Sequence, residues 1–197
     1  MKTKDLENQT ERQKPKARAS RSSSEKNTVL KICFAALMAA IITVFTAFVK
    51  FNTGINNGYL HFGDSMVYLA GCLLGPVGML SSAIGGALAD IIAGSAMWAL
   101  PTAIIKALNC SVFVLASWLY KKKKPFRIVN AFTVTTTVIS GLITIFGYLV
   151  AEGLMYSFPS AWTSVPFSCI QAAGSAVIFV VFGAALDKTK INKLLGR

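Results

Sequence analysis

The sequence predicts an all-α integral membrane protein: a bundle of six transmembrane helices with both termini in the cytoplasm. Hydrophobic residues make up 54% of the 197 residues and charged residues only 14%, whereas a soluble domain carries about 25% charged residues. The apolar residues fall into six runs, several of them near the roughly 20 residues that a helix needs to cross a bilayer. Of the 20 Lys and Arg residues, all except Lys50 and Lys106 lie in residues 1–31, 121–127 and 188–197.

Those basic segments predict the orientation, because Lys and Arg collect in cytoplasmic loops. The N-terminus, a turn at residues 75–76, the loop 121–127 and the C-terminus are expected inside. The loops 51–58, 94–100 and 151–162 are then outside. The formal charge of +12 therefore reflects membrane topology, and nucleic-acid binding is not indicated because no basic and aromatic motif accompanies the charge.

The chain divides into three predicted segments. Residues 1–28 are polar and rich in Lys, Arg and Ser, a composition that buries too little apolar surface to fold, so we expect a disordered basic cytoplasmic tail. Residues 29–186 form the predicted six-helix membrane domain. Residues 187–197 form a second basic cytoplasmic tail.

The first three apolar runs are residues 29–49, 60–74 and 77–93. The second run has 15 residues, about 22 Å of helix, so it crosses about 30 Å of hydrocarbon only with tilt or with shielding by neighbours. Gly75-Pro76 separates it from the third run, in which small residues favour packing against protein. The first run contains small residues four apart, which allow another helix to approach closely: Ala35 with Ala39, and Ala36 with Ala40.

The last three runs are residues 101–120, 128–150 and 163–186. Pro101 suits the first turn of the fourth helix, where its missing N–H has no intrahelical partner anyway. The fifth run is rich in Thr and Val, and the sixth carries Gln171 on one face.

Three ionisable residues interrupt the apolar runs: Asp64, Asp90 and Lys106. A charge inside a membrane helix is costly, so such residues face the protein interior or a cavity and indicate a site. The predicted topology places all three in the outer half of the bundle. We expect Lys106 to pair with either Asp64 or Asp90, which leaves the other carboxylate free to accept hydrogen bonds from a ligand.

Other polar and aromatic side chains share the outer half, and His61, Asp64 and Tyr68 have the spacing of one helix face. Together they predict a pocket open to the outside for a small polar aromatic ligand, with stacking surface from tyrosine and tryptophan, Trp162 included. The predicted binding residues are Tyr59, His61, Asp64, Tyr68, Asp90, Trp98, Lys106, Asn109, Glu152 and Gln171.

No cofactor, metal site or catalytic residue is predicted. The four cysteines are scattered singly and form no CxxC or Cys/His cluster. A nucleophilic cluster of His61, Asp64 and Ser65 lacks a GxSxG-type elbow. The chain has no G-x-x-x-x-G-K-[ST] phosphate loop, so we expect it not to be an enzyme and any ATP hydrolysis to belong to separate subunits.

The sequence resembles the S component of energy-coupling factor (ECF) vitamin transporters, in three stretches: YLHFGDSMVYLAGCLLGP at 59–76, AIGGALADIIAG at 83–94 and PTAIIKAL at 101–108. The resemblance extends over about residues 29–186 and is nearest to the branch for riboflavin, hydroxymethylpyrimidine or pyridoxine. It implies a six-helix substrate-binding subunit in the cell membrane, most simply of a bacterium. It also implies partners: a transmembrane T subunit and two cytoplasmic ATPases.

The resemblance further implies that Ala35, Ala36, Ala39 and Ala40 form the docking motif for the T subunit, and that residues 51–58 form the loop over the pocket. The vitamin stays open at this point. So does an alternative class, a stand-alone gradient-driven carrier of a small polar aromatic metabolite.

Overall fold

The computed structural model describes residues 28–56, 58–120 and 127–189. Two compact units are distinguished, Met1–Phe34 and Ala35–Arg197. Of the first unit, residues 28–34 are described, and they are helical. The predicted tails and the basic loop at 121–127 therefore lie almost entirely outside the described residues.

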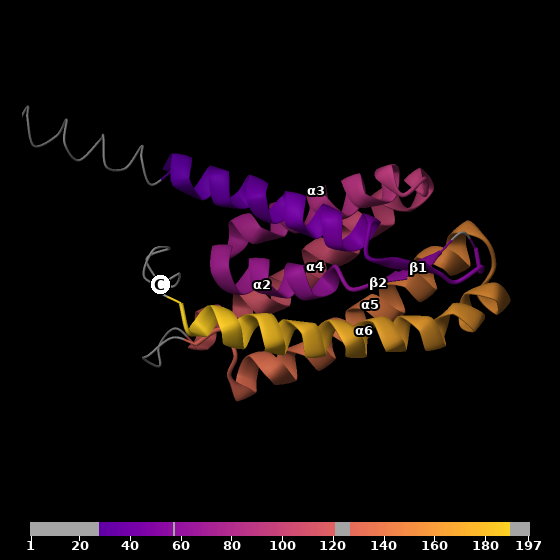
Figure 1. The fold of residues 1–197 in the computed structure, drawn as a ribbon. Coiled ribbons are helices and arrows are strands. Elements are labelled where there is room, and N and C mark those ends of the chain that lie inside the picture. The colour runs from indigo at the N-terminus through magenta and orange to yellow at the C-terminus, as the bar shows by residue number, and fades with distance from the viewer. Residues whose placement is uncertain (1–27, 57, 121–126, 190–197) are drawn as a thin grey trace, which may run out of the picture. The chain divides into compact units, whose positions relative to one another are not determined.

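The described chain is almost all helical, as predicted (Figure 1). Within the described residues, four helical segments are long and apolar enough to cross a membrane, and two further apolar helices are shorter. The predicted all-helical membrane class is confirmed. By length and composition, however, four of the described helices qualify as membrane-crossing, whereas six were predicted. The elements in chain order are the first helix (Thr28–Ala47), β1 (Lys50–Asn52), β2 (Tyr59–His61), α2 (Asp64–Leu74), α3 (Pro76–Ile92), η1 (Ala96–Trp98), α4 (Ala99–Tyr120), α5 (Ala131–Met155) and α6 (Phe158–Asp187).

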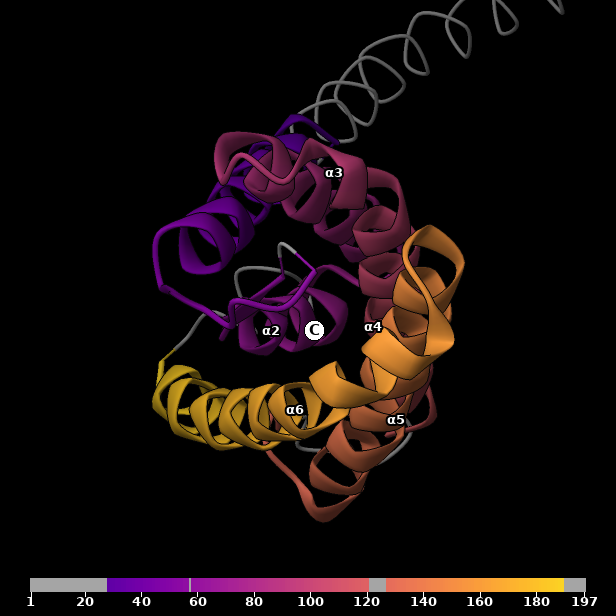
Figure 2. The same cartoon turned by 90° about the vertical axis from the view of Figure 1, so that its right-hand side faces the viewer.

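Helix α2 is the core of the second unit. It is only 11 residues long, and every residue except Leu74 is buried. It contacts α3, α4 and α6, and Figure 2 shows it enclosed by the other helices. This enclosure shields a helix that is too short to span the hydrocarbon alone.

The predicted turn at Gly75-Pro76 is present. Gly75 has φ 64°, a left-handed conformation that favours glycine, and Pro76 opens α3 in the first turn. The α2–α3 hairpin is therefore tight, and it keeps the short helices side by side.

Residues 50–61 form a small antiparallel hairpin, where a loop at 51–58 and a helix from residue 60 were predicted. Lys50 pairs with His61, and Asn52 pairs with Tyr59. Residues of high strand propensity flank a turn that contains Gly54 and Asn56 at positive φ, as hairpin turns require. The second helix therefore begins at Asp64 rather than at residue 60, and His61 lies on β2.

The predicted outer loop at 151–162 is mostly helical. Helix α5 continues to Met155, and α6 begins at Phe158, where the Ser157 side chain accepts from the Ser160 N–H. Pro159 is compatible with the first turn, so it starts the helix instead of breaking it. At the other end, α5 begins later than predicted because the Asn130 side chain caps the helix.

The outward faces of these helices are apolar. Leu100 is 72% exposed and Leu154 is 76% exposed, while threonine and serine side chains such as Thr133, Thr144 and Ser175 are fully buried. Extensive exposed apolar surface indicates contact with a membrane or partner. With the apolar helices, it supports a membrane protein.

Candidate substrate-binding site

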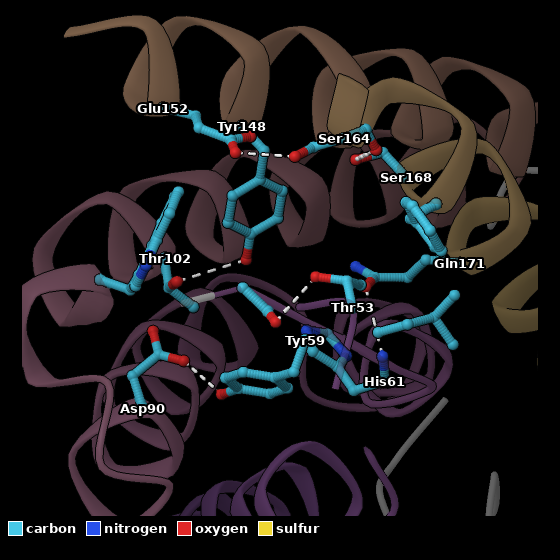
Figure 3. A pocket seen from close by; sticks show the side chains of 14 residues that line it. Thr53, Tyr59, His61, Asp90, Thr102, Tyr148, Glu152, Ser164, Ser168 and Gln171 are labelled. Atoms are coloured by element: carbon cyan, nitrogen blue, oxygen red, sulfur yellow. Dashed lines mark hydrogen bonds between the residues drawn. The ribbon is translucent and has the colours of Figure 1, made fainter. Parts of the chain in front are cut away.

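A cavity lies at one end of the bundle, where α3 and α5 end and α4 and α6 begin. Its empty space is about 560 Å³, part of which opens to solvent. The β1–β2 hairpin supplies one wall, and Figure 3 shows side chains from all these elements around the space. The lining residues are Thr53, Gly58, Tyr59, Leu60, His61, Asp90, Trp98, Thr102, Tyr148, Glu152, Ser164, Phe167, Ser168 and Gln171.

One wall carries Asp90, near the end of α3. The Tyr59 hydroxyl donates a hydrogen bond to Asp90 Oδ1. Burial, reinforced by this carboxylate, raises the pKa of the Tyr59 phenol, so the phenol remains a donor. The other oxygen, Asp90 Oδ2, is buried and has no partner among the described residues.

An aromatic wall stands next to it. The Trp98 ring lies 5.9 Å from the Tyr148 ring and 6.3 Å from the Tyr156 ring, centre to centre. The hydroxyls of Tyr148 and Thr102 are 3.3 Å apart, which fixes Tyr148 from α5 against α4. These contacts hold flat rings around the space, as a planar ligand requires.

The side nearest the hairpin turn is closed by Glu152. Its Oε1 accepts hydrogen bonds from the Asn56 amide and, at 2.7 Å, from the Ser164 hydroxyl. The Asn56 carbonyl oxygen accepts from the Ser160 hydroxyl at 2.9 Å. The hairpin turn is thereby tied to both α5 and α6.

Beneath the cavity lies a buried ion pair. Lys106 Nζ is 2.6 Å from Asp64 Oδ1, and the two side chains are 0% and 1% exposed. Gln171 Nε2 donates to Asp64 Oδ2 at 2.9 Å, and Gln171 Oε1 accepts from the His61 backbone N–H at 3.3 Å. Lys106 therefore pairs with Asp64, which resolves the alternative that the sequence left open.

Glycine makes room for the lysine stem. A Cβ at Gly86 would lie 3.1 Å from Lys106 Cγ and 3.1 Å from the Thr102 methyl carbon. The small residue lets α4 approach α3 closely. The aliphatic stem packs there, and the ammonium group reaches Asp64.

Of the ten predicted residues, six line the cavity: Tyr59, His61, Asp90, Trp98, Glu152 and Gln171. The other four lie in the surrounding core. Asp64 and Lys106 form the ion pair, Tyr68 stacks on Phe113 at 4.5 Å between ring centres, and Asn109 donates to Thr144 Oγ1 at 2.8 Å. Trp162 is largely exposed and does not line the cavity.

His61 reaches the site by a different route from the predicted one. It does not share a helix face with Asp64 and Tyr68 but lies on β2, with its Nε2 3.4 Å from Lys106 Nζ. Strand β2 brings His61 close to Lys106 and Asp64, so only its predicted position on a helix was wrong.

Eight lining residues were not among the ten predicted ones: Thr53, Gly58, Leu60, Thr102, Tyr148, Ser164, Phe167 and Ser168. Thr53 and Gly58 lie in residues 51–58, the segment that the family resemblance placed over the pocket. Tyr148 precedes Glu152 by four residues, and Ser164 and Ser168 precede Gln171 by seven and three, the spacings of one helix face. Leu60 had no such signal, because its position depends on strand pairing.

The fold and the site together define a membrane protein with a partly open pocket, lined by polar and aromatic side chains, at one end of a helical bundle. Residues 26–188 match the family model described as "ECF-type riboflavin transporter, S component". The chain belongs to this family, and it is a substrate-binding subunit of a vitamin transporter rather than an enzyme.

A relative from Pyrococcus woesei is 32% identical over 149 residues. The alignment covers 75% of this chain and 95% of that protein, which is described as "Uncharacterized protein in gap 3'region". The similarity therefore extends over nearly the whole length of the relative.

Proposed function

We propose that the chain is the substrate-binding S subunit of an ATP-driven ECF transporter that imports riboflavin across the cell membrane. Among the vitamins that the sequence left open, riboflavin is favoured over hydroxymethylpyrimidine and pyridoxine by the family that matches residues 26–188. The observation that carries the proposal is the cavity within that matched region, which is lined by polar and aromatic side chains.

The chemistry of the cavity lining suits such a ligand. Tyr59, Trp98, Tyr148 and Phe167 offer flat apolar surface. The lining includes Asp90 and Glu152 but, within the described part of the chain, no Lys or Arg, so an uncharged ligand with hydrogen-bond donors fits best.

The proposed topology has six membrane-embedded helices with both termini in the cytoplasm. In this arrangement the cavity faces outward. The start of α5 and the end of α6 lie at the opposite end of the bundle (Figure 1). Arg127 and Lys188 adjoin these helix ends in the chain, which is consistent with basic residues on the cytoplasmic side. The short helices α2 and α3 are membrane-embedded because their neighbours shield them.

The proposed energy source is a partner complex of a T subunit and two ATPases, docked on the first helix. Ala36 and Ala40 are exposed, while Ala35 and Ala39 are half-buried. A Cβ at Gly85 would lie only 2.6 Å from the Ala39 carbonyl oxygen, so Ala39 packs against α3. Ala36 and Ala40 are therefore the better candidates for the partner surface.

The function is tested by purifying the chain alone in detergent and identifying any bound small molecule by mass spectrometry. We expect riboflavin, and we expect quenching of flavin fluorescence when riboflavin is added to the emptied protein. Uptake in cells should require the T subunit and both ATPases. Uptake that persists without the ATPases would instead favour a gradient-driven carrier.

Docking is tested by a matched pair of substitutions. Ala36→Trp should abolish uptake, because the bulky ring blocks close helix approach, while riboflavin binding to the solitary chain is unchanged. Ala39→Trp should weaken riboflavin binding as well, since Ala39 packs on Gly85. Loss of binding in Ala36→Trp would contradict the proposed surface.

A further inference from the structure

Two buried polar atoms on the cavity wall lack hydrogen-bond partners: Asp90 Oδ2 and Trp98 Nε1. Seven buried side-chain polar atoms have no partner within the described residues, and only these two belong to residues that line the cavity. Asp90 is 3% exposed and Trp98 is 6% exposed. Bulk water therefore does not satisfy them.

The backbone brings the two residues onto one wall. The Ser95 N–H donates to the Asp90 carbonyl at 2.8 Å, and the Trp98 N–H donates to the Ser95 carbonyl at 2.9 Å. These two bonds turn the chain back at the end of α3, so that η1 packs against it.

Both side chains are held in place by other contacts. Tyr59 donates to Asp90 Oδ1, which leaves Oδ2 as the free acceptor. The Trp98 ring packs against the rings of Tyr148 and Tyr156. The neighbouring Thr102 hydroxyl lies near the Asp90 carboxylate, but it makes no hydrogen bond of good geometry to Oδ2 and is 3.3 Å from the Tyr148 hydroxyl.

Leaving such atoms unpaired is costly. A buried donor or acceptor without a partner costs about 1–3 kcal/mol, and the large majority of such groups in proteins are paired. A carboxylate oxygen only accepts, and an indole N–H only donates. The complementary ligand therefore has a donor close to an acceptor on one edge.

We propose that Asp90 Oδ2 and Trp98 Nε1 together recognise the imide edge of a flavin ring. The ring N3–H would donate to Asp90, and an adjacent ring carbonyl would accept from Trp98. This assignment rests on the proposed function and specifies which part of the ligand meets which wall. An ionised phosphate or carboxylate group carries no hydrogen-bond donor for Asp90. We therefore do not expect such a group against this wall of the cavity.

Three flavins test the assignment on the unaltered chain: riboflavin, lumiflavin and 3-methylriboflavin. Lumiflavin lacks the ribityl chain but keeps the imide edge, and 3-methylriboflavin lacks only the N3–H donor. With affinities measured by fluorescence quenching, methylation at N3 should weaken binding by about 10- to 100-fold, as expected for loss of a buried hydrogen bond.

Substitutions then test the two side chains. Asp90→Leu should weaken riboflavin and lumiflavin by the same factor, and N3 methylation should cost nothing further in that variant. Asp90→Asn keeps one acceptor oxygen and should retain part of the affinity. Trp98→Phe keeps a ring but removes the N–H, so it should weaken both flavins by about 3- to 10-fold.

The matched control is Ser175→Ala. Ser175 Oγ is also buried without a partner in the described chain, but it does not line the cavity. Riboflavin affinity should not change. If Asp90→Leu fails to fold, as judged by thermal unfolding in detergent, the Asp90→Asn variant and the 3-methylriboflavin measurement still decide the question.

The outcomes separate the two proposals. Binding of none of the flavins to the unaltered chain overturns riboflavin as the substrate, and this inference with it. Equal affinity for riboflavin and 3-methylriboflavin overturns the imide assignment while the transport function stands. Loss of riboflavin but not lumiflavin affinity in Asp90→Leu would place the ribityl hydroxyls at Asp90 and also overturn it.

Discussion

Asp64 and Asp90 are buried to nearly the same extent, 1% and 3% exposed, yet their surroundings differ. Both oxygens of Asp64 are engaged, by Lys106 and by Gln171. Asp90 has one oxygen bonded to Tyr59 and one without a partner in the described chain. One aspartate lies beneath the cavity, and the other lines it.

The difference teaches that burial alone does not identify a binding carboxylate. A buried charge with a full set of partners belongs to the internal structure, because its interactions are already satisfied. A buried carboxylate with an unused acceptor on a cavity wall is available to a ligand. The two aspartates should therefore respond in opposite ways when stability and binding are measured separately.

The largest effect is expected at the ion pair. Lys106→Met leaves the Asp64 charge buried without its partner and should destabilise the chain by about 3–5 kcal/mol. Thermal unfolding in detergent measures the loss. The double variant Lys106→Met with Asp64→Asn should recover stability, because the unpaired charge is gone.

The matched control for that double variant is Lys106→Met with Asp90→Asn. It should remain unstable, since Asp64 keeps its unpaired charge. Equal recovery in both double variants would contradict the pairing of Lys106 with Asp64. Full riboflavin affinity in the recovered variant would establish that the pair is structural and does not contact the ligand.

A smaller effect is expected at Tyr59. Tyr59→Phe removes the hydrogen bond to Asp90 Oδ1 and should cost about 1.5 kcal/mol, the lower end for a hydrogen bond to a charged group. The same change in an Asp90→Asn background should cost less. Tyr156→Phe is the control, because among the described residues the Tyr156 hydroxyl hydrogen-bonds to Met97 Sδ alone, at an exposed position, and the stability of this variant should be unchanged.

The smallest effect is expected at the hairpin turn. Asn56→Asp keeps a residue type that tolerates positive φ but replaces the amide donor with a carboxylate that faces Glu152. Riboflavin should dissociate about 5-fold faster, which corresponds to about 1 kcal/mol. Asn52→Asp adds the same charge to an exposed position of β1 and should leave the dissociation rate unchanged in stopped-flow fluorescence.

The sequence was sufficient for the helical class and the approximate positions of the apolar segments. Both follow from local features of the sequence, namely the apolar composition of each segment and the Gly75-Pro76 turn. The hairpin was not predictable, because β1 and β2 are three residues each and are stabilised by pairing rather than by a periodic pattern. Helix ends at Asp64 and Phe158 were misplaced for a related reason: pairing and capping decide them.

The depth of the charged residues in the bundle was predictable, but the direction in which each side chain points was not. Helical rise places Asp64, Asp90 and Lys106 at similar distances from the end of the bundle. Which carboxylate meets the lysine depends on the rotation of each helix and on close packing at Gly86, and neither can be obtained from spacing. Tyr148 could have been found from its spacing to Glu152.

The enclosure of α2 has a consequence for biogenesis. An 11-residue helix measures about 16 Å, which is about half the hydrocarbon thickness, and its first residue carries a charge. Released into lipid alone, it would leave Asp64 without Lys106 or Gln171. We therefore expect α2 to enter the bilayer together with α3 as one hairpin, and to reach its final position only after α4 and α6 have been synthesised. The ability to bind a ligand would then arise only after α6, which lines the cavity, has been synthesised and inserted.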